Sequence, residues 1–323
     1  MATTPDLDRP AEPRIDRSFT LHLRGDWGGA NLHRVCGWIA QELGDRSGPH
    51  TRIATWNSRG FVDAIRAVGR DEVQVALTTP VAFATAALDG RGPYQEEFYP
   101  GLRALGVVPQ RDRLVFGIHK SLGVTTFEEL RQAKPALRLA TSVHDGVNHV
   151  GWAAHELLTR SGVDVKGWGG RFLTDERPFE TLDHVIEGRA DAIIHEAVML
   201  PAWQQIGADL NFLEVEPDVL RGLRDDLSWS EAIVPEGYFP GAPQFRTLDF
   251  SDFLVLARED LPGDLAYAIA WVLGETRHVI EGQYRHLPPD RSPVTYPLDP
   301  VTMGVTPVPL HPGAARYYKA LGR

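Results

Sequence analysis

Short apolar segments alternate with amphipathic ones through the first third of the chain. Apolar, β-branched runs typical of strands occupy 18–24, 51–57, 73–79 and 103–110. Segments with the spacing of helices lie between them at 29–44, 61–69 and 80–90. Strands separated by helices of this length predict parallel βαβ units, with helices on both faces of a sheet.

The same alternation then starts again and predicts a second unit of the same kind. It has strands at 114–119, 138–142 and 211–215, helices at 124–133 and 147–162, and a helix, glycine turn and strand within 177–197. Thr126 and Glu129 have the spacing of a capping box at the start of the helix in 124–133. After a Gly/Pro-rich stretch at 234–245 come a strand at 252–259, a helix at 265–282 and a Pro-rich end.

Composition excludes some classes of protein. The 323 residues suffice for two domains, and 43% hydrophobic with 24% charged residues is ordinary for a globular chain. A formal net charge of −10 disfavours a nucleic-acid partner, which basic patches would bind. It leaves room for a small anion, because one arginine or one helix N-terminus can bind it locally.

Cysteine content and the first residues bear on location. Cys36 is the single cysteine, so no intrachain disulfide forms, and we expect it to be a buried hydrophobic residue. No apolar run approaches the ~20 residues of a membrane helix, so no membrane insertion is expected. The first residues lack the apolar region of a secretory signal. We therefore expect a cytoplasmic protein, or a periplasmic or cell-surface one if a signal has been removed.

Several motifs along the chain are typical of one family. They are GDWGGANLH at 25–33, VQVALTTPVAFATAALDG at 73–90, EGRADAII at 187–194, YFPG at 238–241 and LHPGAARYY at 310–318. On these motifs, over about 18–322, the chain resembles the TAXI-family solute-binding proteins of TRAP transporters, which have a type II periplasmic-binding-protein-like fold.

The resemblance implies an α/β, two-lobed clamshell of two doubly wound αβ domains, with the ligand cleft between them. The lobes would be 18–112 plus 246–323, and 113–245, after a disordered leader at 1–17. A membrane permease is the partner that this resemblance implies for an exported protein. Ligands of open α/β sheets lie beyond the carboxyl ends of the strands, which directs attention to the loops there.

The loop GDWGGAN joins a predicted strand to a predicted helix. Gly28 and Gly29 let backbone N–H groups approach a ligand, and the helix N-terminus favours an anion. With Trp27 and Asn31 they form one candidate ligand-binding group. The same glycines also suit a plain strand-to-helix turn, and the pattern does not decide between the two.

Polar residues also follow the next two predicted strands. Trp56, Asn57 and Ser58 end one strand and Thr78 ends the other, and all four are candidate ligand contacts. Thr79 is expected to cap the helix that begins at Pro80.

Histidines gather at the corresponding loops of the second unit. In HDGVNH, we expect Asp145 to cap the helix and His144, Asn148 and His149 to face the cleft. His195 and Glu196 end a predicted strand, so their side chains point to opposite faces and one of them faces the ligand. A satisfied core histidine and a hinge ion pair explain this pair equally well.

Few other groups are indicated. His144, His149, His195 and Glu196 could bind a divalent metal together, but their spacing does not require one, and no cofactor is expected. Arg171 is a candidate carboxylate partner, and so is Arg24. His311 is expected to fix the C-terminal segment.

Two hypotheses follow. The first is a TAXI-type protein that binds a small organic molecule, expected to be a carboxylate. The second is a cytoplasmic enzyme on the same fold, a non-redox decarboxylase, hydrolase or isomerase in which His195 or His149 moves a proton and Glu196 assists. His195-Glu196 and the loop TSVHDGVNHV depart from the family pattern, and these departures favour the second hypothesis.

Overall fold

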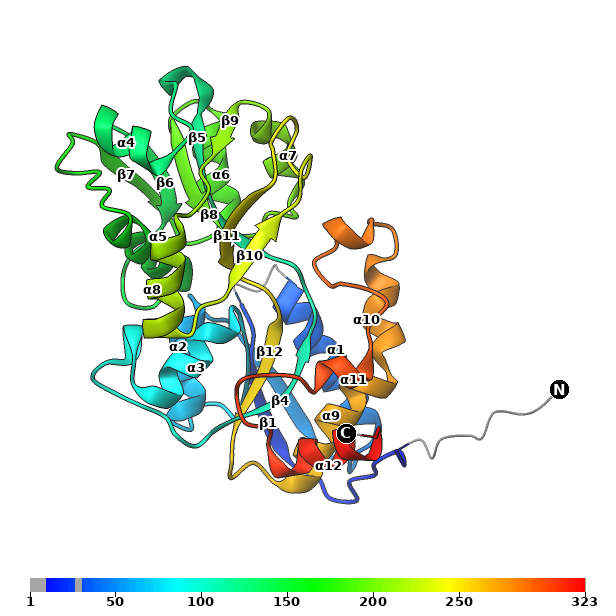
Figure 1. Cartoon of the computed structure of the whole chain (residues 1–323). Coiled ribbons are helices and arrows are strands. Elements are labelled where there is room, and N and C mark those ends of the chain that lie inside the picture. Colours follow the sequence, from blue (N-terminus) through cyan, green and yellow to red (C-terminus); the bar gives the residue numbers. More distant parts are fainter. Residues whose placement is uncertain (1–9, 27–30, 323) are drawn as a thin grey trace.

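The computed structural model describes residues 10–26 and 31–322, and they build two β-sheets with helices packed around each (Figure 1). The first sheet has the order β2-β1-β3-β12-β4. Its strands are β1 (Thr20–Arg24), β2 (Arg52–Trp56), β3 (Val75–Thr78), β4 (Leu102–Val108) and β12 (Phe253–Arg258). β1 pairs in parallel with β2 and β3, whereas β12 runs antiparallel to β3 and β4.

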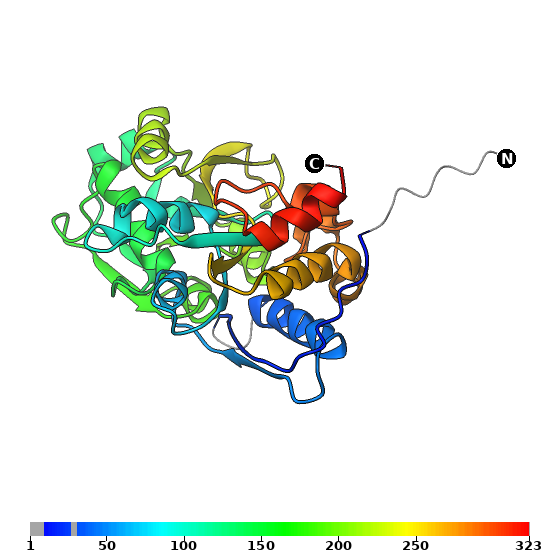
Figure 2. The same ribbon diagram turned by 90° about the horizontal axis from the view of Figure 1, so that it is seen from below.

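Helices from both ends of the chain surround the first sheet, and together with it they form what we call the first lobe (Figure 1). They are α1 (Asn31–Asp45), α2 (Phe61–Gly69), α3 (Val81–Asp89), α9 (Gly263–Glu275), α10 (Arg277–Tyr284), α11 (Pro300–Met303) and α12 (Pro312–Ala320). Figure 2 shows α12 beside α9, so the end of the chain completes the lobe that its beginning starts.

The second sheet has the order β10-β11-β5-β8-β6-β7, with β9 paired to β5. Its strands are β5 (Arg113–His119), β6 (Arg138–Ser142), β7 (Arg171–Asp175), β8 (Ala192–His195), β9 (Leu210–Phe212), β10 (Glu231–Val234) and β11 (Phe245–Asp249). The second lobe adds the helices α4 (Phe127–Ala133), α5 (His149–Arg160), α6 (Pro178–Ile186), α7 (Pro201–Gly207) and α8 (Pro217–Leu227).

Two short crossovers join the lobes. Residues 109–112 lead from β4 to β5, and residues 250–252 lead back from β11 to β12. The crossovers are hydrogen-bonded to each other, since the Phe250 N–H donates to the Asp112 carbonyl at 3.1 Å. Two αβ lobes with two adjacent crossovers form the type II clamshell architecture, so the predicted fold class is confirmed.

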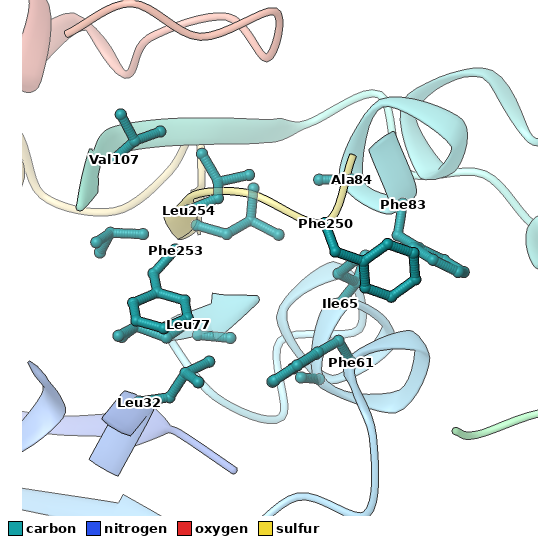
Figure 3. Close-up of a cluster of buried hydrophobic side chains, with 14 of the residues drawn as sticks. Leu32, Phe61, Ile65, Leu77, Phe83, Ala84, Val107, Phe250, Phe253 and Leu254 are labelled. Carbon is teal, nitrogen blue, oxygen red and sulfur yellow. The ribbon is translucent and has the colours of Figure 1, made fainter. Parts of the chain in front are cut away.

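Aromatic side chains fill the contact between the lobes on one side of the crossovers. Phe83 of α3 meets the rings of Trp152 on α5 and Trp229 after α8, each at 5.5 Å between centroids. The Trp229 ring stacks on Phe250 of the second crossover at 5.4 Å. Figure 3 shows Phe61, Phe83 and Phe250 at one end of the buried cluster, with Leu32 and Phe253 toward the other. Hydrophobic burial therefore holds the lobes together here.

The C-terminal motif docks on glycines of the first lobe. Tyr318 of α12 approaches Gly106 of β4, and its hydroxyl donates to the Leu105 carbonyl at 3.2 Å. Tyr317 lies against Gly274 of α9 and donates to Glu275 at 2.9 Å. The LHPGAARYY motif is therefore a packing element of the first lobe.

Several local expectations need correction. The sheets are mixed rather than purely parallel, because β12 and β5 run against their neighbours. The helix expected at 265–282 breaks at Thr276, whose hydroxyl bonds the Val272 carbonyl and accepts from Trp38. Part of the expected disordered leader is ordered, since Trp271 donates to the Pro10 carbonyl at 3.1 Å.

Two expected helix caps are also wrong. Thr79 caps no helix, because its hydroxyl donates to the Phe250 carbonyl at 2.9 Å. Asn148, not Asp145, caps α5 by accepting from the Val150 and Gly151 N–H groups. The cap at Thr126 is confirmed, since Thr126 accepts from the Glu129 N–H at 3.1 Å. In the described part of the chain, no helix has both the length and the apolar character to cross a membrane.

Gly106 offers a direct test of the C-terminal docking. Its φ is 150°, and an added Cβ would collide with the Tyr318 hydroxyl and stand 3.0 Å from Leu273. We expect Gly106→Ala to lower the free energy of unfolding in urea by about 2–3 kcal/mol.

Two companion variants sharpen this test. Tyr318→Phe in the Gly106→Ala background removes the colliding hydroxyl and should restore part of the loss. Gly282→Ala in α10, where nothing lies near the added Cβ, should gain up to about 1 kcal/mol. Equal effects of Gly106→Ala and Gly282→Ala would show that α12 does not pack on β4 in this way.

Candidate functional site

A cavity of about 460 Å³ lies between the lobes. The first lobe contributes Asp26, Thr79 and the beginnings of α1 and α2, and the second contributes Glu196 and the beginnings of α6 and α7. The crossovers supply Asp112, with Phe253 beside the second one. Most lining side chains are apolar: Leu32, Phe61, Pro178, Phe179, Ala197, Met199, Leu200, Pro201, Phe253, Leu287 and Pro293.

Strand ends position the polar groups of the cavity. Asp26 follows β1, Thr79 follows β3 and Glu196 follows β8, each just beyond the carboxyl end of its strand. In open α/β sheets this edge is where ligands bind, because loops and helix N-termini converge there. Backbone topology therefore makes this cavity the candidate site.

The Asp112 carboxylate ties the first crossover to the loop after β8. Its two oxygens accept from the N–H groups of Arg113 at 2.7 Å, Ala197 at 2.8 Å and Val198 at 3.0 Å. Ala197 has a positive φ of 61°, an unusual conformation for alanine. These bonds fix the loop that carries Glu196 at the edge of the cavity.

Glu196 and Asp112 form a buried pair of carboxyl groups. Glu196 is 7% exposed and Asp112 is 3% exposed. Burial, and then the neighbouring Asp112, raise the pKa of Glu196 well above its ordinary value. Burial also raises the pKa of Asp112, but three backbone N–H groups stabilise a charge on its carboxylate. Glu196 is therefore the partner that holds the proton, and its O–H donates a hydrogen bond to Asp112.

Two arginines also line the cavity. Arg34 of α1 lies over the Tyr284 ring, 5.7 Å from its centroid. Arg291 lies 3.6 Å from the centroid of the Tyr238 ring and donates to the Tyr238 carbonyl, so the segment after α10 reaches the second lobe. The cavity wall thus contains two guanidinium groups as well as the carboxyl pair.

His195 lies behind Glu196 and is fully buried. Its Nδ1 accepts from the Glu196 N–H at 3.0 Å, so its Nε2 carries the hydrogen and donates to the Ser142 hydroxyl at 3.0 Å. Burial lowers the pKa of His195 to about 4, which keeps the ring neutral. His195 does not line the cavity, so of the adjacent pair Glu196 faces it.

His149 is also fully buried, at the first position of α5. Its ring packs against Phe61, with centroids 4.2 Å apart, and neither ring nitrogen has a hydrogen-bond partner. Burial, and then His195, lower the pKa of His149 well below its ordinary value. His149 therefore stands next to the cavity wall without lining it.

The structure places the other sequence-predicted residues in varied positions. Asn31 lines the cavity and accepts from the Tyr284 hydroxyl at 2.7 Å. Trp56 is 52% exposed beside His22, and Asn57 is exposed. Ser58 donates to the Gly60 carbonyl at 2.6 Å. Thr78 is buried at the end of β3.

The remaining candidates lie away from the cavity. His144 is exposed and stacks on His155 at 4.3 Å, and Asn148 is used as the helix cap. Arg171 is exposed at the start of β7, and Arg24 pairs with Asp63. His311 caps α12, as a segment-fixing residue would. Trp27, Gly28 and Gly29 lie outside the described residues.

Sequence reasoning missed several cavity residues. One feature of the sequence could have indicated Asp112: it lies between the last strand of the first predicted unit and the first strand of the second. Phe61, Tyr284 and Arg291 have no local signal, since tertiary packing brings them to the cavity. Within 10–26 and 31–322, no three His, Cys, Asp or Glu side chains are grouped closely enough to hold a metal ion.

One comparison with known proteins identifies a family. The model of the NMT1-like family matches residues 33–322. A search of curated proteins finds no match. Among solved structures, R. palustris Rpa4515 with adipate is 17% identical, covering 95% of this chain and 96% of that one with a TM-score of 0.49.

Two further structures show similarity of the same order. XAC2383 from Xanthomonas citri, bound to chloride ion, is 11% identical over 94% of this chain and 98% of that one, with a TM-score of 0.49. PhnD1 from Prochlorococcus marinus, in complex with methylphosphonate, is 14% identical over 79% and 82%, with a TM-score of 0.46. None of them is close enough to transfer a ligand to this chain.

His149 predicts a pH-dependent effect on stability. The folded state keeps its ring neutral, while the unfolded chain takes up a proton below about pH 6.5, so this group destabilises the fold increasingly as pH falls. We expect His149→Leu to be more stable than the wild type, with an advantage about 2 kcal/mol larger at pH 5 than at pH 8.

Urea unfolding at the two pH values measures this difference. His50→Leu, at an exposed histidine, is the matched control and should show no such pH-dependent gain. An advantage of His149→Leu that is the same at both pH values would mean that the ring is protonated in the folded state.

Proposed function

The chain belongs to the NMT1-like family, and on that basis we propose that it is a solute-binding protein that holds a small organic molecule in the interlobe cavity. The observation that carries this proposal is the cavity itself. It lies between two lobes, beyond the strand ends, with both crossovers close to its floor. A binding protein that closes on a ligand by hinge motion needs this arrangement.

We propose that ligand capture closes the lobes against each other. Polar contacts already join their rims: Arg59 donates to Glu176 at 2.6 Å and to Asp145 at 3.2 Å. Arg91 donates to the Asp226 carbonyl at 2.9 Å. The boundary expected at residue 246 falls within β11, which belongs to the second sheet. The units that move would therefore be the first lobe and the second lobe, with β11 in the second, pivoting on the crossovers at 109–112 and 250–252.

For the ligand we propose an organic carboxylate with an apolar body. Arg34 and Arg291 offer guanidinium groups that suit a carboxylate, and the apolar walls suit a hydrocarbon portion. The Glu196 carboxyl, whose hydrogen is donated to Asp112, would accept a hydrogen bond from a polar group of the ligand. We propose Asn31 and Glu196 as direct contacts, and Trp27, Gly28 and Gly29 on sequence grounds alone.

A finer proposal concerns the transport system. The LHPGAARYY and GRADAII motifs support a TAXI-type receptor that delivers its ligand to a TRAP-type membrane permease. That role requires an exported protein. The motifs pack the first lobe and form β8, so they support the architecture of such a receptor rather than its ligand.

One observation favours a second candidate function. Glu196 keeps a proton at the wall of a mostly apolar cavity, which is the setting of a general acid. In a non-redox decarboxylase the substrate would lose CO₂, and Glu196 would protonate the carbanion and then be reprotonated by solvent. His195 would position Glu196 through its backbone N–H, since it does not line the cavity.

Proton NMR with mono- and dicarboxylates, adipate among them, tests both candidates. For a binding protein we expect saturation transfer to at least one acid, with its resonances unchanged over hours. Arg291→Met should lower the affinity for that acid about tenfold, because a charge-assisted contact is lost. Arg246→Met, at an exposed arginine paired with Glu214, is the matched control and should bind normally.

The other outcomes discriminate as clearly. Product resonances that vanish with Glu196→Gln would identify an enzyme. If saturation is transferred to none of the acids, the carboxylate proposal is overturned.

A further inference from the structure

His149 is surrounded by aromatic rings. Phe61 lies 4.2 Å away between ring centroids, Phe250 lies 6.1 Å away and Phe83 lies 6.3 Å away. The side chain is fully buried, and neither Nδ1 nor Nε2 has a partner. The ring is therefore a polar group in an apolar environment.

The fold makes no use of either nitrogen. A neutral imidazole carries one hydrogen-bond donor and one acceptor, and leaving both unpaired in a buried site is costly. The backbone N–H groups at the start of α5 are already capped by Asn148. An apolar side chain of similar size would suit these surroundings better, so the nitrogens are available to a group that enters from outside.

Phe61 stands between His149 and the cavity. It is the first residue of α2, it lines the cavity, and its ring packs directly on the imidazole. The preceding Gly60 lies against the backbone of Val147 and Asn148, so the start of α2 touches the segment that leads into His149. Among the described residues, Phe61 is the aromatic side chain that both lines the cavity and packs on the imidazole, so it separates the cavity from the two unpaired ring nitrogens.

We infer that Phe61 is a movable partition, and that the cavity continues behind it into a polar subsite where His149 bonds a hydroxyl or amide group of the ligand. Such groups both donate and accept, as a neutral imidazole does. The ligand would then be a hydroxylated or amidated organic acid. This inference rests on the proposed function, because it extends the same cavity.

Access to His149 can be measured without any ligand. Diethyl pyrocarbonate carbethoxylates neutral, accessible imidazoles, and peptide mass mapping reports each histidine separately. His195 is the internal reference, since it is equally buried but hydrogen-bonded to Ser142. In the wild type we expect His149 to react about tenfold faster than His195, because movement of Phe61 exposes it without unfolding.

Two variants that each remove one phenylalanine ring show by which path the reagent reaches His149. Phe61→Ala opens the partition and should speed labelling of His149 by about tenfold. Phe250→Ala also removes a ring beside His149, but Phe250 does not line the cavity, so labelling should change less than about threefold. Equal rates in the two variants, a parallel rise at His195, or no rise with Phe61→Ala would overturn the partition.

A ligand pair tests the chemistry of the subsite. We expect the wild type to prefer 4-hydroxybutyrate over butyrate by about tenfold, and His149→Leu to lose that preference while still binding butyrate. An unchanged preference in His149→Leu would overturn the role of His149. If neither acid binds, the proposed carboxylate function fails, whereas the labelling rates still decide whether Phe61 moves.

Discussion

The Asp112 carboxylate is the interaction on which the candidate site depends. It lies on the first crossover and accepts from backbone N–H groups of its own strand and of the loop after β8. Those bonds hold Ala197 in its unusual conformation and thereby direct Glu196 to the cavity. Because the second crossover bonds the same residue, the hinge and the acidic wall of the cavity are one structural unit. A lobe movement that kept these bonds would carry Glu196 with it.

Contacts between the lobes are of two kinds. On one side, the rings of Phe83, Trp152 and Trp229 bury apolar surface, which stabilises contact without regard to direction. At the rim, Arg59 makes exposed ion pairs, which salt screens and which contribute little each. Opening the lobes would therefore be opposed mainly by the aromatic contact.

Sequence patterns predicted the elements well where their apolar spacing was regular. The helix at 61–69 and the strand at 138–142 match α2 and β6, because their apolar positions have one clear period. The helix α8 and the strands β10 and β11 were missed, since five of the eleven residues of α8 are charged and the two strands lie within or beside a Gly/Pro-rich stretch.

The site was harder to predict. Trp56 is the last residue of β2 and Asn57 follows it, but β2 is the edge strand of its sheet, so its end is far from the crossovers. The spacing of apolar residues along the sequence predicts strands but not their order in a sheet. It also does not predict that Arg291 and Tyr284 fold back onto the cavity, or that Glu196 holds a proton. Each of these depends on contacts between residues distant in the chain.

The difference between the exposed and the buried residues of the cavity has a consequence for how a solute arrives. Among the described lining residues, Arg34, Phe179, Pro201 and His286 are exposed and mark the entrance, whereas Asp112 and Glu196 are buried. A cation therefore stands at the entrance and carboxyl groups stand in the interior, which gives the cavity a gradient of charge. A molecule with one anionic end would be oriented by this gradient during entry, its uncharged end leading, before it touched any residue of the interior.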